Sequence, residues 1–233
     1  MATLSETVDL TDGTGFIDVR GSGFDSMLLV DGRPIALNWC DCEGSVAQYL
    51  VRAGRTDCEQ ELQALRHTLE GHLLPDVPLQ TQISPFLELL APGHYELSYI
   101  EACPDCHFVV FDTSWDFATD HDQFYPFGTD LVLTQASDSL NPDRIEHFVR
   151  RIQAGQRPIA LTLTVPQSWC EFVIDGHHKL QAYKAAMVGP TLISVCRLDA
   201  PKLNPDSFAA HLGASHPKSR DYRRVKTDHD PGA

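Results

Sequence analysis

The sequence predicts an α/β (α+β) protein, and three observations support this class. Asp31-Gly32 stands between two short apolar runs, residues 27–30 and 34–37, which is a strong signal for a β-hairpin. Residues 143–199 follow the order helix, strand, strand, loop, helix, strand. Hydrophobic residues make up 42% of the chain, which is enough to form a buried core.

The chain divides into four expected parts. Residues 1–15 are polar and acidic, and we expect a flexible leader there. Residues 16–128 are expected to form an α+β region, and residues 129–203 a separate α/β domain. Residues 204–233 contain a basic cluster and few apolar side chains, so we expect a mostly disordered tail.

Composition also limits the partners and the compartment. The formal net charge of −14 repels the backbone of nucleic acids, so we expect no nucleic-acid partner. No apolar run reaches the roughly 18 residues that a membrane helix needs. The N-terminus lacks the basic and apolar regions of a signal peptide. We therefore expect a soluble, cytoplasmic protein with no membrane contact.

The N-terminal region is expected to contain a helix as well as the first hairpin. Thr56 and Glu59 have the spacing of a capping box, in which each side chain satisfies a free N–H group of the first turn. One apolar stripe with helical spacing follows. Its members are Leu62, Leu65, Leu69 and Leu73.

Two further strands are expected before the middle of the chain. Residues 95–100 and 107–111 alternate in hydropathy, and Cys103-Pro104-Asp105-Cys106 joins them as the tip of a hairpin. Residues 112–128 are acidic and aromatic. We expect this stretch to pack across a surface or to cover a cleft.

The C-terminal part begins with a short strand and a capped helix. Residues 131–133 form the strand. Asn141 can cap the helix that follows, and Pro142 suits its first position, where a missing N–H costs nothing. Gly155 is expected to end this helix in a left-handed conformation.

Two strands, a helix and a last strand complete this part. Apolar residues alternate with Ala and Thr over residues 159–165, which predicts a strand with one buried face. Residues 169–174 form the next strand, residues 179–187 a helix, and residues 191–197 the last strand. The helix is expected to turn three side chains inward, those of Leu180, Tyr183 and Met187.

The loop Asp175-Gly176-His177-His178-Lys179 connects a predicted strand directly to a predicted helix. The first N–H groups of a helix lack partners, and together with the helix dipole they attract anions. Gly176 lets the backbone approach an anion closely, while His178 and Lys179 add charged donors. Asp175 can bind magnesium, orient a histidine, or accept a proton from a substrate hydroxyl. A polar capping turn with solvated histidines is the alternative interpretation.

The segment from Phe172 to Ala186, FVIDGHHKLQAYKAA, resembles the signature of the ParB N-terminal/sulfiredoxin-like superfamily. That signature is usually Ile-Asp-Gly-His-(His/Arg)-Arg-Leu-x-Ala-Ala. The predicted helix around 145–152, followed by Arg157-Pro158-Ile159, is similar to the family's entry into the next strand. The resemblance covers about residues 130–200.

The resemblance implies a ParB/sulfiredoxin-like small mixed sheet with helices, and a nucleotide-phosphate site at the loop. Carried over by position, Gly176, His177, His178 and Lys179 would surround the phosphates. The implied ligand is ATP or another nucleotide with magnesium. Members of the superfamily include CTP-hydrolysing partition proteins, ADP- or ATP-dependent serine kinases, and sulfiredoxins.

The resemblance therefore implies a phosphotransferase (kinase) or a nucleotide hydrolase. His178 and Lys179 would neutralise charge that develops in the transfer, and Asp175 would act as metal ligand or base. The kinase branch also has an upstream catalytic carboxylate. Asp138 and Glu171 are the two candidates for it.

The chain departs from the family at two positions. His177 stands where sulfiredoxins have their reactive cysteine, and Lys179 stands where arginine is usual.

An alternative function is a non-catalytic ParB-like binding module that acts through protein–protein contacts. The phosphotransferase that the resemblance implies would also need an acceptor, which can be a small molecule or a protein.

Two cysteine pairs suggest a structural zinc site. Cys103 and Cys106 have the spacing of a zinc knuckle, and Cys40 with Cys42 would complete four thiolate ligands. The second pair has the less usual Cys-x-Cys spacing, and about 60 residues separate the pairs. Two separate pairs of ordinary thiols are the alternative.

Overall fold

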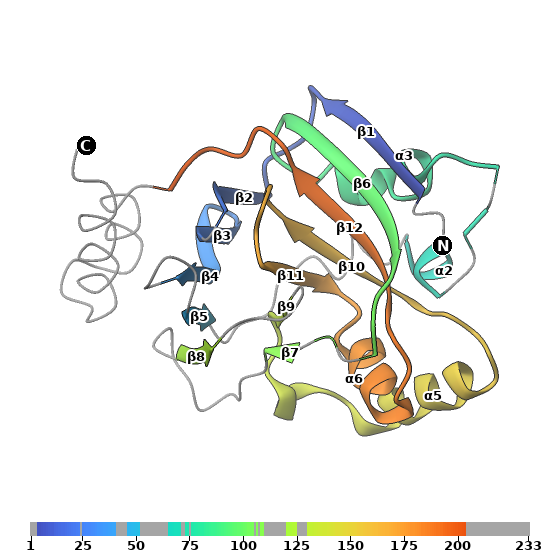
Figure 1. Cartoon of the computed structure of the whole chain (residues 1–233). Coiled ribbons are helices and arrows are strands. Elements are labelled where there is room, and N and C mark those ends of the chain that lie inside the picture. Colours follow the sequence, from blue (N-terminus) through green and yellow to red (C-terminus); the bar gives the residue numbers. More distant parts are fainter. Residues whose placement is uncertain are drawn as a thin grey trace.

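The computed structural model has a mixed α+β fold built on two sheets (Figure 1), which confirms the fold class. It describes residues 4–23, 25–40, 46–51, 65–70, 73–74, 76–104, 106, 108–109, 120–124 and 130–203. The larger sheet has seven strands in the order β1 (Leu4–Leu10), β6 (Gly93–Glu101), β12 (Thr191–Arg197), β10 (Ile159–Thr164), β11 (Cys170–Asp175), β9 (Asp130–Leu133) and β7 (Phe108–Val109). The smaller sheet has five strands in the order β2 (Ile17–Ser22), β3 (Asp25–Val30), β4 (Arg33–Cys40), β5 (Val46–Val51) and β8 (Asp120–Phe124).

The described helices are short except for two near the C-terminal end of the fold. They are α2 (Arg66–Leu69), α3 (Leu79–Gln82), α4 (Ser84–Leu87), η1 (Ser137–Ser139), α5 (Pro142–Gln153) and α6 (His177–Ala186). The two longer helices, α5 and α6, lie together at one end of the larger sheet (Figure 1). Among the helices that the structure describes, none has the length and the apolar character required to cross a membrane.

Several local predictions are confirmed. Asp31 and Gly32 have φ angles of 50° and 67° and form the tight turn between β3 and β4, where Val30 pairs with Arg33. The Asn141 side chain caps α5, because its Oδ1 accepts hydrogen bonds from the amides of Asp143 at 2.8 Å and Arg144 at 3.4 Å.

Strand pairing corrects both the predicted leader and the predicted domain boundary. Residues 4–10, expected to be flexible, pair along their whole length with residues 93–99 of β6. Strand β6 also pairs with β12, so strands from both sides of the expected boundary at residues 128 and 129 share one sheet. The cause is long-range hydrogen bonding between strand edges, which local composition does not encode.

The hairpin expected between residues 95 and 111 is also wrong. Strand β6 pairs with β1 and β12, whereas β7 pairs in parallel with β9. The Cys103–Cys106 segment is therefore a connection between distant strands of the sheet. Three other predictions fall wholly or largely outside the described residues: the capped helix start at 56–59, the tail 204–233, and the aromatic stretch 112–128, of which the structure describes β8 alone.

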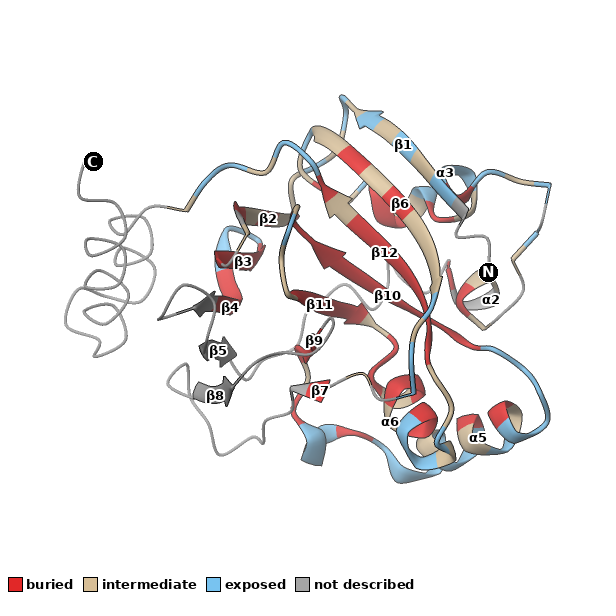
Figure 2. Cartoon of the chain, in the orientation of Figure 1, coloured by how far each residue is buried: buried red, intermediate tan, exposed pale blue. Residues whose placement is uncertain are grey.

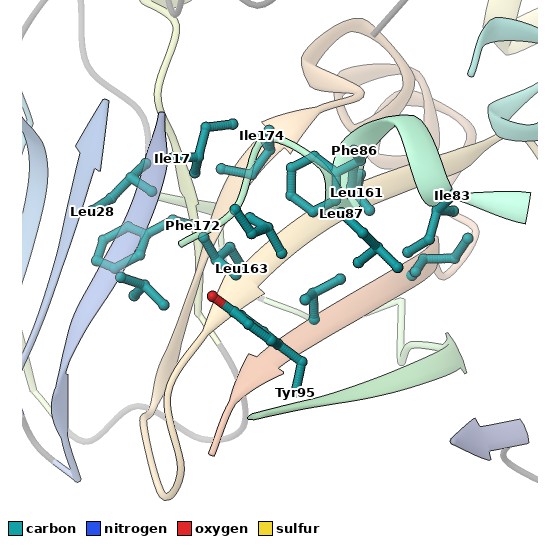
Figure 3. Close-up of a cluster of buried hydrophobic side chains, with 14 of the residues drawn as sticks. Ile17, Leu28, Ile83, Phe86, Leu87, Tyr95, Leu161, Leu163, Phe172 and Ile174 are labelled. Atoms are coloured by element: carbon teal, nitrogen blue, oxygen red, sulfur yellow. The ribbon is translucent and has the colours of Figure 1, made fainter. Parts of the chain in front are cut away.

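The central strands β10, β11 and β12 are largely buried (Figure 2), and apolar clusters lie on both of their faces. All six residues of β10 are buried, so the expectation of one buried face is wrong for this strand. On one face, apolar side chains from β10 and β11 meet residues from β2, β3 and α4 (Figure 3). On the opposite face, Ala160, Val173 and Leu192 pack with Leu180 of α6. This second contact fixes α6 against the sheet.

Helix α6 starts and ends differently from the prediction. It begins at His177 rather than at Lys179, so both histidines belong to its first turn. Leu180 and Tyr183 are buried as expected. Met187 was expected to point inward, but it follows the helix in a left-handed conformation, with φ 54° and ψ 40°, and its side chain is 85% exposed.

The strained backbone at Met187 gives a stability prediction. The left-handed conformation costs a residue with a Cβ roughly 1–2 kcal/mol, and glycine does not have this cost. Part of the gain is offset by the greater freedom of glycine in the unfolded chain, so we expect Met187→Gly to stabilise the protein by about 0.5–1 kcal/mol. Urea unfolding measures this change.

Ala185→Gly is the matched control, because Ala185 is exposed within the same helix. We expect this control to lose about 1 kcal/mol. An equal loss of stability in both variants would contradict the assignment of strain to Met187.

Candidate functional site

The candidate site is the turn between β11 and α6. Gly176 is the N-cap residue of α6, with φ 105° and ψ 14°. Its backbone lies so close to β10 that an added Cβ would stand 2.6 Å from the Cβ of Ala160. Glycine is therefore required both by the backbone conformation and by the close contact.

Lys179 points into the protein from the first turn of α6. Its Nζ donates to a carboxylate oxygen of Asp175 at 2.8 Å and to the carbonyl oxygen of Ile159 at 2.9 Å. Only 7% of Lys179 is exposed. The ammonium group thus holds the start of α6 against the first residue of β10, and its charge is balanced by its neighbour instead of facing solvent.

Asp175 is ionised in this arrangement. Burial by itself would raise its pKa, but the ammonium group of Lys179 outweighs this effect and lowers the pKa below its ordinary value. His177 and Arg144 lower the pKa further. About a third of the Asp175 side chain, 35%, remains exposed.

His177 is buried and accepts a hydrogen bond. The amide of Thr134, the residue after β9, donates to His177 Nε2 at 3.1 Å. The Thr134 hydroxyl lies 3.1 Å from the same nitrogen and donates to the carbonyl oxygen of Val173 at 2.7 Å. Burial lowers the pKa of His177 to about 4, and the charge of Lys179 acts in the same direction. His177 is therefore neutral at pH 7.

His178 makes an equivalent contact with Asn141, which ends the loop that Thr134 begins between β9 and α5. The amide of Asn141 donates to His178 Nε2 at 3.0 Å. Burial and then the guanidinium group of Arg144 lower the pKa of His178 to about 4. The imidazole is thus a neutral acceptor through Nε2, whereas the sequence suggested a charged donor.

The remaining amide donors lie at the N-terminus of α6, because the first amides of α5 are already bonded to Asn141 and His178. No side chain within the described part of the chain caps the start of α6, because its N-cap residue is glycine. The contact between His178 and Asn141 brings the N-terminus of α5 to the same place. Arg144, in the first turn of α5, is exposed and acts electrostatically on both Asp175 and His178. The amide groups of α6, the dipoles of both helices and a guanidinium group therefore converge here.

Comparisons with protein-family models, with curated proteins and with solved structures found no match to the chain. The superfamily resemblance of residues 172–186 stays a prediction.

Sequence reasoning missed three contributors to this site. Thr134 and Arg144 contact or act on the histidines, and the carbonyl group of Ile159 receives Lys179. Arg144 had a detectable signal, since it stands three residues after a predicted N-cap. The other two contacts are tertiary and leave no local pattern.

The two carboxylate candidates have different environments. Asp138 is exposed in η1, between β9 and α5. Glu171 is buried within β11, where the hydroxyl of Thr162 donates to Oε2. Burial raises the pKa of Glu171, and the hydrogen bonds from Thr162 and Ser194 only partly oppose this shift.

The expected zinc ligands are only partly described. Cys103 is exposed, Cys106 is half-buried, and the amide of Cys106 donates to the carbonyl oxygen of Cys103 at 3.2 Å. Cys40 is the last residue of β4, and Cys42 lies outside the described residues. Within the described ranges, no three His, Cys, Asp or Glu side chains are grouped to hold a metal ion. The four-cysteine site stays a prediction.

The buried Glu171 carboxyl group gives a pH prediction. Because the pKa of Glu171 is raised in the folded state, folding takes up a proton at pH values above the unfolded pKa of about 4.3. The stability that the protonated carboxyl group contributes is therefore lost as pH rises through the folded pKa. We expect Glu171→Gln to remove this loss and to unfold at a higher temperature than the wild type at pH 8.

Thermal unfolding between pH 4.5 and pH 8 checks the effect. Glu146→Gln, at an exposed position of α5, is the control and should follow the wild-type curve. If Glu171→Gln loses as much stability with rising pH as the wild type does, Glu171 is not the cause.

Proposed function

We propose that this protein binds the phosphate groups of a nucleotide, with magnesium, at the N-terminus of α6. One observation carries the proposal: the uncapped start of α6 meets the start of α5 beside Arg144. Anions bind at helix N-termini because free amide groups point along the dipole, as at the start of α6. The start of α5 is capped by Asn141, so it adds the field of its dipole without free amide groups. The likeness of residues 172–186 to the ParB/sulfiredoxin-like signature supports a nucleotide as the source of the phosphate.

The ionisable residues of the site suggest how charge would be balanced. Lys179 and Asp175 neutralise each other, and both histidines are neutral, so Arg144 and the amide groups supply the attraction. A polyphosphate carries more negative charge than these groups balance, which is why magnesium belongs to the proposal. The exposed part of Asp175 is suited to meet the hydrated ion.

The contacts favour binding over catalysis. A phosphotransferase or hydrolase would use Asp175 as base or metal ligand and Lys179 to stabilise the transferred group. Both side chains hold each other in the present arrangement, so catalysis requires that ligand binding separate them. These contacts therefore favour the alternative function, a non-catalytic ParB-like module that binds nucleotide and contacts another protein, over the phosphotransferase or hydrolase.

Isothermal titration with ATP, ADP and CTP, each with magnesium, tests the binding. We expect Arg144→Gln to weaken the affinity of the best ligand about tenfold, equivalent to about 1.4 kcal/mol, because it removes a charge-assisted contact. Arg150→Gln, an exposed change in the last turn of α5, is the control and should bind as the wild type does. Failure of the wild type to bind any of these nucleotides would end the proposal.

Nucleotide turnover separates the two candidates. An enzyme should release or transfer phosphate with magnesium, and Asp175→Asn should reduce that rate at least about a hundredfold while the protein still binds. A binding module should bind the nucleotide and show no turnover in either protein. Turnover that is unchanged in Asp175→Asn would remove Asp175 from the catalytic role.

A further inference from the structure

Adjacent histidines in the first turn of α6 hold the two ends of one loop. This loop, residues 134–141, connects β9 to α5 and contains η1. His177 Nε2 accepts from the amide of Thr134 at 3.1 Å, at the start of the loop. His178 Nε2 accepts from the amide of Asn141 at 3.0 Å, at its end. Both bonds join side chain to backbone, so they fix the path of the loop.

These contacts define the chemical form of both rings. A backbone N–H group donates only to a ring nitrogen that carries a lone pair, so Nε2 is unprotonated in each histidine. A neutral imidazole then carries its proton on Nδ1. The Thr134 hydroxyl uses its proton on the Val173 carbonyl oxygen, so it donates no hydrogen bond to His177 Nε2, and the assignment of His177 rests on the backbone amide bond alone.

We propose that His177 and His178 are positioning residues that, as neutral Nδ1–H imidazoles, hold the loop 134–141 against the first turn of α6. Asn141 is both the end of this loop and the N-cap of α5, so the His178 contact also sets where α5 begins. Arg144 follows within the same turn. The functional part of this inference rests on the proposed phosphate site, whereas the structural part does not.

The inference differs from the role that the sequence suggested for the histidines. A histidine that neutralised phosphate would be a charged donor, and its replacement by any uncharged side chain would weaken binding. A positioning histidine acts through Asn141 and Arg144. It can be replaced by a side chain that only accepts a hydrogen bond at the same distance from the backbone.

Glutamine provides that replacement, because its Oε1 reaches about as far as Nε2 and accepts without titrating. We expect His178→Gln to keep the nucleotide affinity within about twofold of the wild type. His178→Ala leaves the Asn141 amide without its acceptor, and we expect about fivefold faster hydrogen exchange at that amide and a similar loss of affinity. His147→Ala, at an exposed position of α5, is the control for both measurements.

Nitrogen-15 NMR of the wild-type imidazole rings at pH 7 reads the chemical form without any substitution. We expect both rings as neutral Nδ1–H tautomers, with the Nε2 resonances shifted by hydrogen bonding. A charged ring, or an Nε2–H tautomer, at either histidine would overturn the proposal. So would an affinity lost equally in His178→Gln and His178→Ala, since this pattern means that the imidazole contacts the anion.

The exchange measurement is made without ligand, which keeps the two proposals separate. If His178→Ala speeds exchange at Asn141 while no nucleotide binds the wild type, the positioning role holds and the proposed function fails. If exchange at Asn141 is the same in His178→Ala and in the wild type, the positioning role fails, whatever the affinity.

Discussion

The buried ammonium group of Lys179 is the contact on which the candidate site depends. It joins the carboxylate that ends β11 to the first carbonyl group of β10, and it does so from within the first turn of α6. The close approach of Gly176 to Ala160 completes this fixation from the other side. The start of the helix is therefore held rigidly to two central strands, which are themselves buried on both faces.

Fixation of the helix start bears on the proposed function. Because Asp175 and Lys179 neutralise each other, a phosphate group at the proposed site would be attracted mainly by backbone amides, helix dipoles and Arg144. Amide groups recognise phosphate oxygens by position more than by net charge, so they work only if they are preorganised. The neutral histidines extend this preorganisation to the loop before α5.

Local signals in the sequence predict local structure well in this protein. The turn at Asp31-Gly32, the Asn141 cap and the strand–glycine–helix junction at residue 176 all depend on a few neighbouring residues. Contacts between distant segments were not predictable in this way. Strand β1 looks like a polar leader until β6 is beside it. The spacing between Asp175 and Lys179 permits an ion pair, but the second acceptor of the ammonium group, the carbonyl oxygen of Ile159, is a tertiary contact that the sequence does not reveal.

The most direct test of this account is a crystal structure of the protein with ADP and magnesium. We predict phosphate oxygens within hydrogen-bond distance of the amides of residues 177–179 and of the Arg144 guanidinium group, with His177 and His178 still bonded to the loop 134–141. A nucleotide bound elsewhere, with the start of α6 facing solvent and no anion beside it, would contradict the central claim.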